Sequence, residues 1–299
     1  MKFLLVDGFN LAFRAFHGMP ALTRADGFPV GAIFGWVHIL WKLQEQEAPD
    51  RVAVFFDKEG SQRHLALHAD YKANRAETPE ALAAQIPELK TITAHLGFRV
   101  IEQGGIEADD LIASAAKALA QASHDVRIAS ADKDFAQCVN ERIHLLAPPP
   151  PSQRKAGWIR LDASGVRGKF SVPPEQIVDY LSLIGDTVDN IPGLPGVGPK
   201  TAVTWLEAHG NIEGILSARE TLLPERLRDI LRESEDRLRL NRQLIAFRTD
   251  FPGDWETPGQ ADTSAARAFF ERMQMHSALK ELDRRAAKSS SIPAQLELF

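Results

Sequence analysis

The sequence predicts an α/β protein: a mostly parallel, twisted sheet with helices on both faces, followed by a helical lobe. Two observations favour this fold. Short apolar runs alternate with longer segments of helical periodicity through the first 172 residues, which is typical of a parallel sheet with helical crossovers. From about residue 173 the strand pattern stops and helical segments take over. We therefore predict an α/β core at 1–172, a helical lobe at 173–285 and a flexible tail at 286–299.

The elements of the core follow from this alternation. Four short β-branched or apolar runs are predicted to be buried strands: KFLLV (2–6), VAVFF (52–56), FRVI (98–101) and VRIAS (126–130). Helical periodicity predicts helices in the core at 30–46, 79–96 and 108–122, and in the lobe at 173–185 and 220–245. The proline-rich stretch at 148–157 predicts an exposed connector.

The composition is that of an ordinary soluble globular protein. Of the 299 residues, 44% are hydrophobic and 25% charged, which is enough for one large core and a lobe. The apolar run at the start is too short for a signal peptide, and no stretch approaches the ~20 apolar residues of a membrane span. We therefore expect a cytoplasmic protein. The single cysteine, Cys138, excludes an internal disulfide and a cysteine-rich zinc site.

Acidic side chains directly follow the predicted strands or open the helix that precedes one. The carboxyl ends of parallel strands lie on one edge of a sheet, where ligands bind, so acids distant in sequence should converge there. The motif GDTVDN, further along the chain, adds two more. Nine carboxylates are therefore predicted to share one cleft: Asp7, Asp57, Glu107, Asp109, Asp110, Asp132, Asp134, Asp186 and Asp189.

Such a cluster needs cations. Two like charges at 4 Å repel by ~4 kcal/mol at an effective dielectric near 20, and several such pairs would rival the ~5 to 15 kcal/mol stability of a typical domain. Carboxylates without histidine or cysteine suit Mg²⁺ or Mn²⁺. A pair of such ions hydrolyses phosphodiesters. A phosphatase with an aspartyl nucleophile is an alternative, because Asp132 and Asp134 form an Asp-x-Asp pair after a strand.

A glycine-rich loop at 190–202 separates these alternatives. Gly193, Gly196 and Gly198 allow tight turns, and Pro199 is placed to begin a helix. A loop of this kind between two helices points backbone amides at a phosphate oxygen. It starts directly after Asp189, so a grip on a DNA backbone would adjoin the acidic cleft, and a small-molecule phosphatase has no use for it.

Six segments together resemble one known family. VDGFNLAFRAF, FFDKEGSQRH, YKANRAETPEAL, GIEADDLIA, ADKDF and GDTVDNIPGLPGVGPKTA are similar to the successive motifs of the 5′-to-3′ exonuclease (flap endonuclease) family, especially the 5′-nuclease domain of bacterial DNA polymerase I. The similarity runs in order from residue 2 to about 250. No polymerase region follows, so the expectation is a stand-alone form with the PIN/5′-nuclease fold, a helical arch around 60–97 and a helix-hairpin-helix-like DNA-binding lobe.

The resemblance also implies roles for matching residues. One metal ion would be surrounded by Asp7, Asp57, Glu107 and Asp109, and a second would be surrounded or supported by Asp109, Asp110, Asp132, Asp134, Asp186 and Asp189. The implied catalytic residues are Lys72, Arg75, Asp132 and Asp134, with the two basic side chains on the scissile phosphate. The implied DNA contacts also include Arg14, Tyr71 stacking on a terminal base, the three loop glycines and Lys200. A K⁺ ion held by the 190–202 loop is a further family feature.

The net charge of −5 does not exclude a nucleic-acid partner. Without the nine cleft acids, 31 acidic residues face 35 basic ones, so the rest of the molecule carries about +4. The final residues QLELF resemble the peptide by which bacterial replication proteins bind the sliding clamp. Its contacts would come from Gln295, Leu296, Leu298 and Phe299.

We therefore expect a two-metal, structure-selective 5′ nuclease that acts on 5′ flaps, nicked ends or RNA primers in replication and repair, associated with the nucleoid. The alternative of another class is a non-catalytic, clamp-tethered protein that binds DNA junctions.

Overall fold

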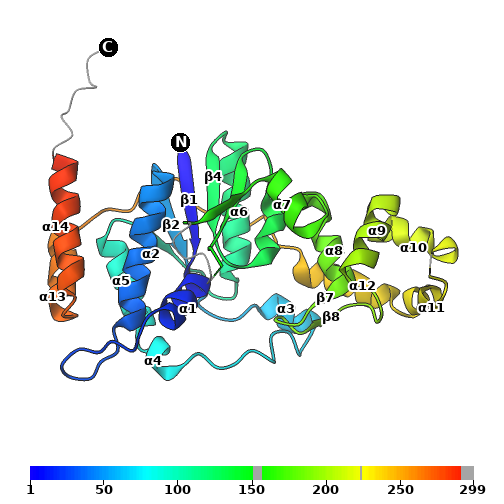
Figure 1. Ribbon diagram of the computed structural model, residues 1–299, viewed down its shortest axis with the longest axis horizontal. Coiled ribbons are helices and arrows are strands. Elements are labelled where there is room, and N and C mark those ends of the chain that lie inside the picture. Colours follow the sequence, from blue (N-terminus) through cyan, green and yellow to red (C-terminus); the bar gives the residue numbers. More distant parts are fainter. Residues whose placement is uncertain (151–156, 223, 291–299) are drawn as a thin grey trace, which may run out of the picture.

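The computed structural model describes residues 1–150, 157–222 and 224–290 (Figure 1). A six-stranded sheet forms the centre of the core, in the order β3-β2-β1-β4-β5-β6. The first five strands in the chain run parallel, and the sixth is antiparallel to its neighbour. The strands are β1 (Lys2–Asp7), β2 (Arg51–Phe55), β3 (Arg99–Ile101), β4 (Asp125–Ala129), β5 (Ile143–Ala147) and β6 (Ile159–Leu161). Four of them confirm the predicted strands, whereas the sequence pattern does not predict β5 and β6.

Helices cover both faces of the sheet, as predicted. Successive residues of a strand point to opposite faces: Phe3 and Leu5 of β1 face one apolar cluster, and Leu4 and Val6 face the other. The first cluster includes α6 (Ala108–Gln121) and α7 (Ala163–Phe170), and the second includes α1 (Gly8–Gly18), α2 (Gly31–Glu47) and α5 (Ile86–His95). The central strand β1 is thus buried on both faces, which explains its continuous apolar sequence.

The helix predicted at 79–96 is divided in two. A short α4 (Glu80–Ala83) ends at Ala84, and α5 begins at Ile86 with Pro87 in its first turn. Proline has no backbone N–H to continue a helix but suits the first turn of a new one, so the chain restarts there.

The predicted arch around 60–97 is helical only in part. It contains α3 (Gln62–Leu67), a series of turns at 69–75 and a stretch without regular secondary structure at 76–79. Helix α5 belongs to the core instead, because Leu89 and Ile92 are fully buried there. The part that crosses below α1 in Figure 1 is the segment between α3 and α4.

The helical lobe lies at the opposite end of the molecule from α13 and α14 (Figure 1). It consists of η3 (Pro174–Gln176), α8 (Ile177–Ile184), β7 (Gly185–Asp186), β8 (Ile191–Pro192), α9 (Pro199–His209), α10 (Ile212–Ser217), η4 (Arg219–Thr221), α11 (Arg226–Glu233) and α12 (Glu235–Ile245). The helix predicted at 220–245 is therefore two helices that meet at Ser234.

The last two helices return to the core. In α13 (Thr263–Arg272) and α14 (His276–Ser290), buried apolar residues such as Phe270 and Leu282 pack in the cluster of α2 and α5. The predicted range 173–285 places α13 and most of α14 in the lobe, whereas their buried residues lie in the cluster of the core, and α14 continues to Ser290 beyond the predicted start of the tail at 286. The clamp-like peptide at 295–299 and most of the predicted connector, 151–156, lie outside the described residues. Among the described residues, no helix combines the length and apolarity needed to cross a bilayer.

Candidate metal centre

Asp7 marks the centre of the acidic site, at the carboxyl end of the central strand. It is the last residue of β1 and the N-cap of α1, where its Oδ1 accepts a hydrogen bond from the backbone N–H of Asn10 (3.2 Å). Its Oδ2 accepts a hydrogen bond from Ser130 Oγ (2.6 Å), in the residue that follows β4. The two neighbouring strand ends are thus tied together at this carboxylate.

Asp57 and the start of α6 form the side of the site next to β2. Asp57 Oδ1 accepts a hydrogen bond from the backbone N–H of Ala108 (2.7 Å), so the strand end caps the first turn of the helix. Glu107 is the N-cap residue of α6, and Asp109 lies in its first turn. Burial raises the pKa of Asp109, and the nearby charges of Asp7, Asp132 and Asp57 raise it further, so acids from four segments meet here.

Asp134, Asp186 and Asp189 form the tightest group, with one oxygen from each within 4.8 Å of the others. Asp134 is brought there by the 3₁₀ helix η1 (Lys133–Cys138), which Asp132 caps by accepting the N–H of Asp134 (2.9 Å). Asp134 Oδ1 is buried, and no hydrogen bond to it is found among the described residues. Three clustered carboxylates, one of them with a buried oxygen that accepts no hydrogen bond from the residues described, fit a hard divalent cation.

Burial and mutual repulsion raise the pKa values of five carboxyls at the site. Burial raises the pKa of Asp7 to about 7, and it raises the pKa of Asp57 as well. Burial together with neighbouring acids raises the pKa values of Asp109, Asp132 and Asp134. The carboxylates therefore resist ionisation unless cations lie among them.

Three basic side chains supply positive charge from within the chain. Lys72 Nζ donates to Glu107 Oε1 (2.9 Å), and Arg75 Nη2 donates to Asp189 Oδ1. The third, Lys133, donates from Nζ to Asp186 Oδ2 (2.5 Å). Lys72 and Arg75 are thus brought to the acids as the sequence indicates. Lys133 was missed, although its place between the two acids of ADKDF could have drawn attention to it.

The segment that carries Lys72 and Arg75 is fastened to the loop between β7 and β8. The backbone N–H of Lys72 donates to the carbonyl of Asp189 (3.1 Å), and Asn74 Nδ2 donates to the carbonyl of Thr187 (2.6 Å). Lys72 has a left-handed backbone, with φ of 58°. A lysine in this region is strained, and such strain often occurs at functional sites.

Tyr71 is not available for stacking on a base in this conformation. It is 8% exposed, and one face of its ring stacks on His64, with centroids 4.6 Å apart. Its hydroxyl lies 3.5 Å from Glu107 Oε2 and 3.4 Å from Asp189 Oδ2. Base stacking therefore requires the segment to move and stays a prediction. The sequence also gives no signal for His64, whose Nδ1 lies 3.3 Å from Glu107 Oε2.

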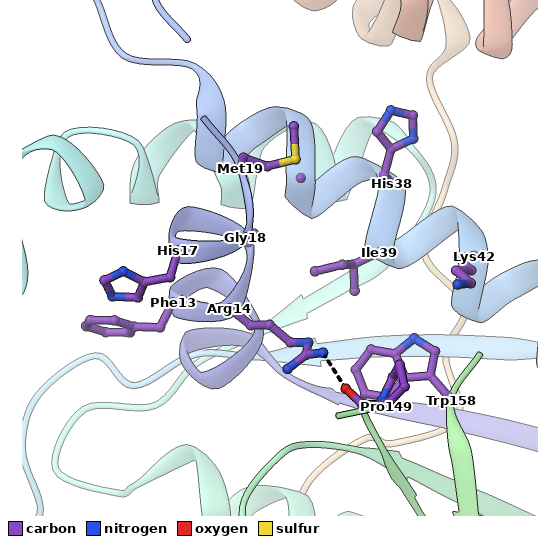
Figure 2. Close-up of a pocket in the computed structure, with 12 residues that line it drawn as sticks. Phe13, Arg14, His17, Gly18, Met19, His38, Ile39, Lys42, Pro149 and Trp158 are labelled. Atoms are coloured by element: carbon purple, nitrogen blue, oxygen red, sulfur yellow. Dashed lines mark hydrogen bonds between the residues drawn. The ribbon is translucent and has the colours of Figure 1, made fainter. Parts of the chain in front are cut away.

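Two predicted site residues have other partners. Asp110 Oδ1 accepts the backbone N–H of Arg248 (2.8 Å), and burial raises the pKa of Asp110 to about 6. Arg14 lies further along α1, where its Nη2 donates to the carbonyl of Pro149 (3.0 Å). Figure 2 shows this bond at one wall of a pocket of about 600 Å³, which Trp158 also lines. The metal role of Asp110 and the DNA role of Arg14 stay predictions.

The glycine-rich loop joins α8 to α9 next to the acidic site. Gly193 is required by packing, since a Cβ there would lie 2.3 Å from the carbonyl carbon and oxygen of Ile184. Gly196 has a left-handed backbone with φ of 78°, and Gly198 is the N-cap of α9. Gly196, Gly198 and Lys200 are exposed. This end of the loop is therefore open to a phosphate backbone, while Gly193 holds its base in place.

Comparisons with known proteins agree with this geometry. Residues 2–171 match the family model described as "5'-3' exonuclease, N-terminal resolvase-like domain", and residues 172–266 match "5'-3' exonuclease, C-terminal SAM fold". The chain is 34% identical to the 5'-3' exonuclease of Aquifex aeolicus over 284 aligned residues. The alignment covers 94% of each protein. The chain is 38% identical over 282 residues to the thermostable DNA polymerase I of Thermus aquaticus, which covers 94% of this chain and 33% of the relative.

The chain thus spans a quarter to a third of the length of the polymerase relatives that it matches. Among solved structures, it resembles the flap endonuclease of bacteriophage T5 in a complex with DNA and metal ions. The TM-score is 0.67 at 22% identity, and the likeness covers 95% of this chain and 98% of that one. This similarity shows a shared fold.

Proposed function

The chain belongs to the 5′-3′ exonuclease family, and from this premise we propose that it is a structure-selective 5′ nuclease that hydrolyses DNA phosphodiesters at 5′ flaps, nicks or primer ends. The observation that carries the proposal is the meeting of Asp134, Asp186 and Asp189 around a buried carboxylate oxygen without a hydrogen-bond partner. A site made of carboxylates alone suits Mg²⁺ or Mn²⁺.

The acids of the proposed site form two groups, each of which would hold one ion. Asp134, Asp186 and Asp189 would hold one ion, and Asp7, Asp57, Glu107 and Asp109 would hold the other, with Asp132 between the two groups. When bound, such ions lower the pKa of a coordinated water and offset charge on the phosphate. The carboxylates supply the ligands. The raised pKa values of Asp7, Asp57, Asp109, Asp132 and Asp134 make this binding pH-dependent.

The basic residues would act on the substrate itself. Lys72 and Arg75 lie beside the acids on a segment made of turns, so an incoming phosphate can compete for them with Glu107 and Asp189. At the scissile phosphate they would stabilise the charge that develops in the transition state. The exposed end of the 190–202 loop, with Lys200 and a K⁺ ion, would hold the duplex a short distance away.

A cleavage assay on matched flap, nick, single-stranded and RNA-primed substrates tests the proposal. We expect cutting of 5′-flap DNA with Mg²⁺ or Mn²⁺. Replacing Asp132 and Asp134 together with alanine should abolish cutting and spare DNA binding. Asp283→Asn, a change of an exposed acid on α14 that pairs with Arg267, serves as the control and should cut normally.

The outcomes separate the alternatives. A non-catalytic junction binder would bind the flap and cut with neither ion. A small-molecule phosphatase would hydrolyse p-nitrophenyl phosphate and ignore DNA. Retained cutting in the double alanine variant would contradict the assignment of the metal centre.

We also propose that the peptide Gln295 to Phe299 binds a bacterial sliding clamp, on the basis of its sequence alone. Tethering would raise the local concentration of the nuclease at replication and repair junctions, in the cytoplasm at the nucleoid. Deleting residues 295–299 should remove clamp capture in a pull-down and leave the cleavage rate on free DNA unchanged. Capture that survives the deletion would rule out this peptide as the contact.

A further inference from the structure

We propose that Lys133 is a built-in counter-ion at the Asp134, Asp186 and Asp189 group, and that it weakens the binding of a divalent ion at this group. The inference rests on the proposed function, because it concerns the regulation of one of the two metal positions. It assigns to this group the lower metal affinity of the two.

The contacts of Lys133 place its charge among these carboxylates. Its Nζ lies 2.5 Å from Asp186 Oδ2 and 3.9 Å from Asp134 Oδ1. Mg²⁺ binds carboxylate oxygens at about 2.0 to 2.1 Å. An ion that uses the same oxygens would therefore lie within a few ångströms of the ammonium group. The two cations compete for Asp186, and each loses stability when the other is present.

Lys133 differs from the other two basic residues in the backbone that carries it. Lys72 and Arg75 belong to the turns at 69–75, which hydrogen bonds fasten to the neighbouring loop. Lys133 belongs to η1, which is anchored by Phe135, fully buried in the core, and by Gln137, whose Nε2 donates to the carbonyl of Ile245 (3.0 Å). Its backbone therefore stays at the site whether or not substrate is bound.

Lys133 would weaken metal binding without preventing it, because its side chain is partly exposed. The side chain of Lys133 is 34% exposed, so it can turn toward water when an ion binds. An ion could then still bind at the Asp134, Asp186 and Asp189 group, but at a higher concentration than without the lysine. The second group, around Asp7, Asp57 and Asp109, has Lys72 and Arg75 as nearby cations, and both lie on the segment that a phosphate can draw away.

Titration calorimetry with Mn²⁺ on the full, metal-free chain without DNA tests the inference. We expect wild type to bind one ion tightly and a second weakly. Lys133→Met keeps most of the unbranched side chain and removes its charge, and it should tighten the weak step by about tenfold. Lys133→Gln also removes the charge and should also tighten the weak step. It provides the test if Lys133→Met does not fold. Lys280→Met, an exposed lysine on α14, changes the net charge equally and should leave both steps unchanged.

Asp186→Asn identifies the step that belongs to this group, because it should remove the weak step. If wild type binds only one ion, a second ion bound by Lys133→Met supports the inference. Affinities that stay within about twofold in both folded Lys133 variants would overturn it, even if wild type cuts flap DNA normally. A wild-type protein that neither binds Mn²⁺ nor cuts would overturn the proposed function itself.

Discussion

Replacing Asp7 with asparagine is expected to stabilise the metal-free protein at neutral pH, although it removes a proposed metal ligand. Asp7 is 5% exposed, and burial, with Asp132 and Asp57 nearby, raises the pKa of its carboxyl from 3.8 to about 7. Between these values the folded protein holds a proton that the unfolded chain has lost. The free energy of unfolding therefore falls as the pH rises through this window, and Asp7→Asn removes that loss.

The structure sets the size of the effect. The interval between 3.8 and about 7 corresponds to about 4 kcal/mol, which is the upper limit of the gain. The variant loses the charge-assisted bond from Ser130 Oγ, worth about 1.5 to 3 kcal/mol. The cap to Asn10 should survive, because asparagine caps helices about as well as aspartate. We expect a net gain of about 1 to 2 kcal/mol at pH 7.5.

Urea denaturation in the presence of a chelator, at pH 5 and pH 7.5, measures this effect. The advantage of Asp7→Asn should be larger at pH 7.5. With Mg²⁺ at 100 times its dissociation constant, wild type gains about 2.7 kcal/mol and the order should reverse. Asp283→Asn should follow wild type throughout. The reasoning would be refuted if, with chelator present at pH 7.5, Asp7→Asn unfolded at the same or a lower urea concentration than wild type and both proteins changed equally with pH. Ionisation of Asp7 would then not destabilise the metal-free protein.

Three further predictions concern the glycine-rich loop, Lys72 and the metal. Gly193→Ala should lower the free energy of unfolding by about 2 to 3 kcal/mol in urea, because the new Cβ meets the backbone of Ile184. Gly198→Ala, whose Cβ meets nothing within 4 Å, should lower it by less than about 1 kcal/mol, the cost of a poorer N-cap for α9. Lys72→Met should lower the single-turnover cleavage rate by about 10² to 10³ with little change in flap-DNA affinity; an unchanged rate would exclude it from the transition state. Chelation should abolish cleavage and added Mg²⁺ should restore it, and cutting that persists in excess chelator would contradict a metal mechanism.

The convergence of the acids could be predicted because it depends on topology alone. Once β1, β2 and β4 are recognised as parallel neighbours, Asp7, Asp57 and Asp132 must reach the same edge of the sheet. The helical periodicity after residue 173 predicted the helical lobe, and the family motifs added the expectation that it binds DNA. By contrast, β6 has three residues, two of them exposed, and presents no apolar pattern to detect. It is a strand because β5 offers it an edge with which to pair.

The docking of α13 and α14 could not be read from the order of elements. Both helices follow the lobe in sequence, yet their apolar faces pack where α2 and α5 leave a surface to cover, with Trp41 and Phe270 in edge-to-face contact. The partners of Lys133 and His64 are equally invisible in sequence, since Asp186 and Glu107 lie far from them along the chain. Contacts between distant segments decide these features, and a local pattern carries no information on them.

The charges at the site suggest why the chain folds around so many acids before any ion arrives. Glu107, Asp189 and Asp186 are each paired with a cation, whereas Asp134 keeps a buried oxygen without a hydrogen-bond partner among the described residues. Lys72 and Arg75 lie in the turns at 69–75, whereas Lys133 lies in η1, which is anchored in the core. A phosphate that draws the first two away would leave their carboxylates free for metal at the moment when substrate is in place. Substrate and metal should therefore bind cooperatively, and each should raise the affinity for the other by the same factor.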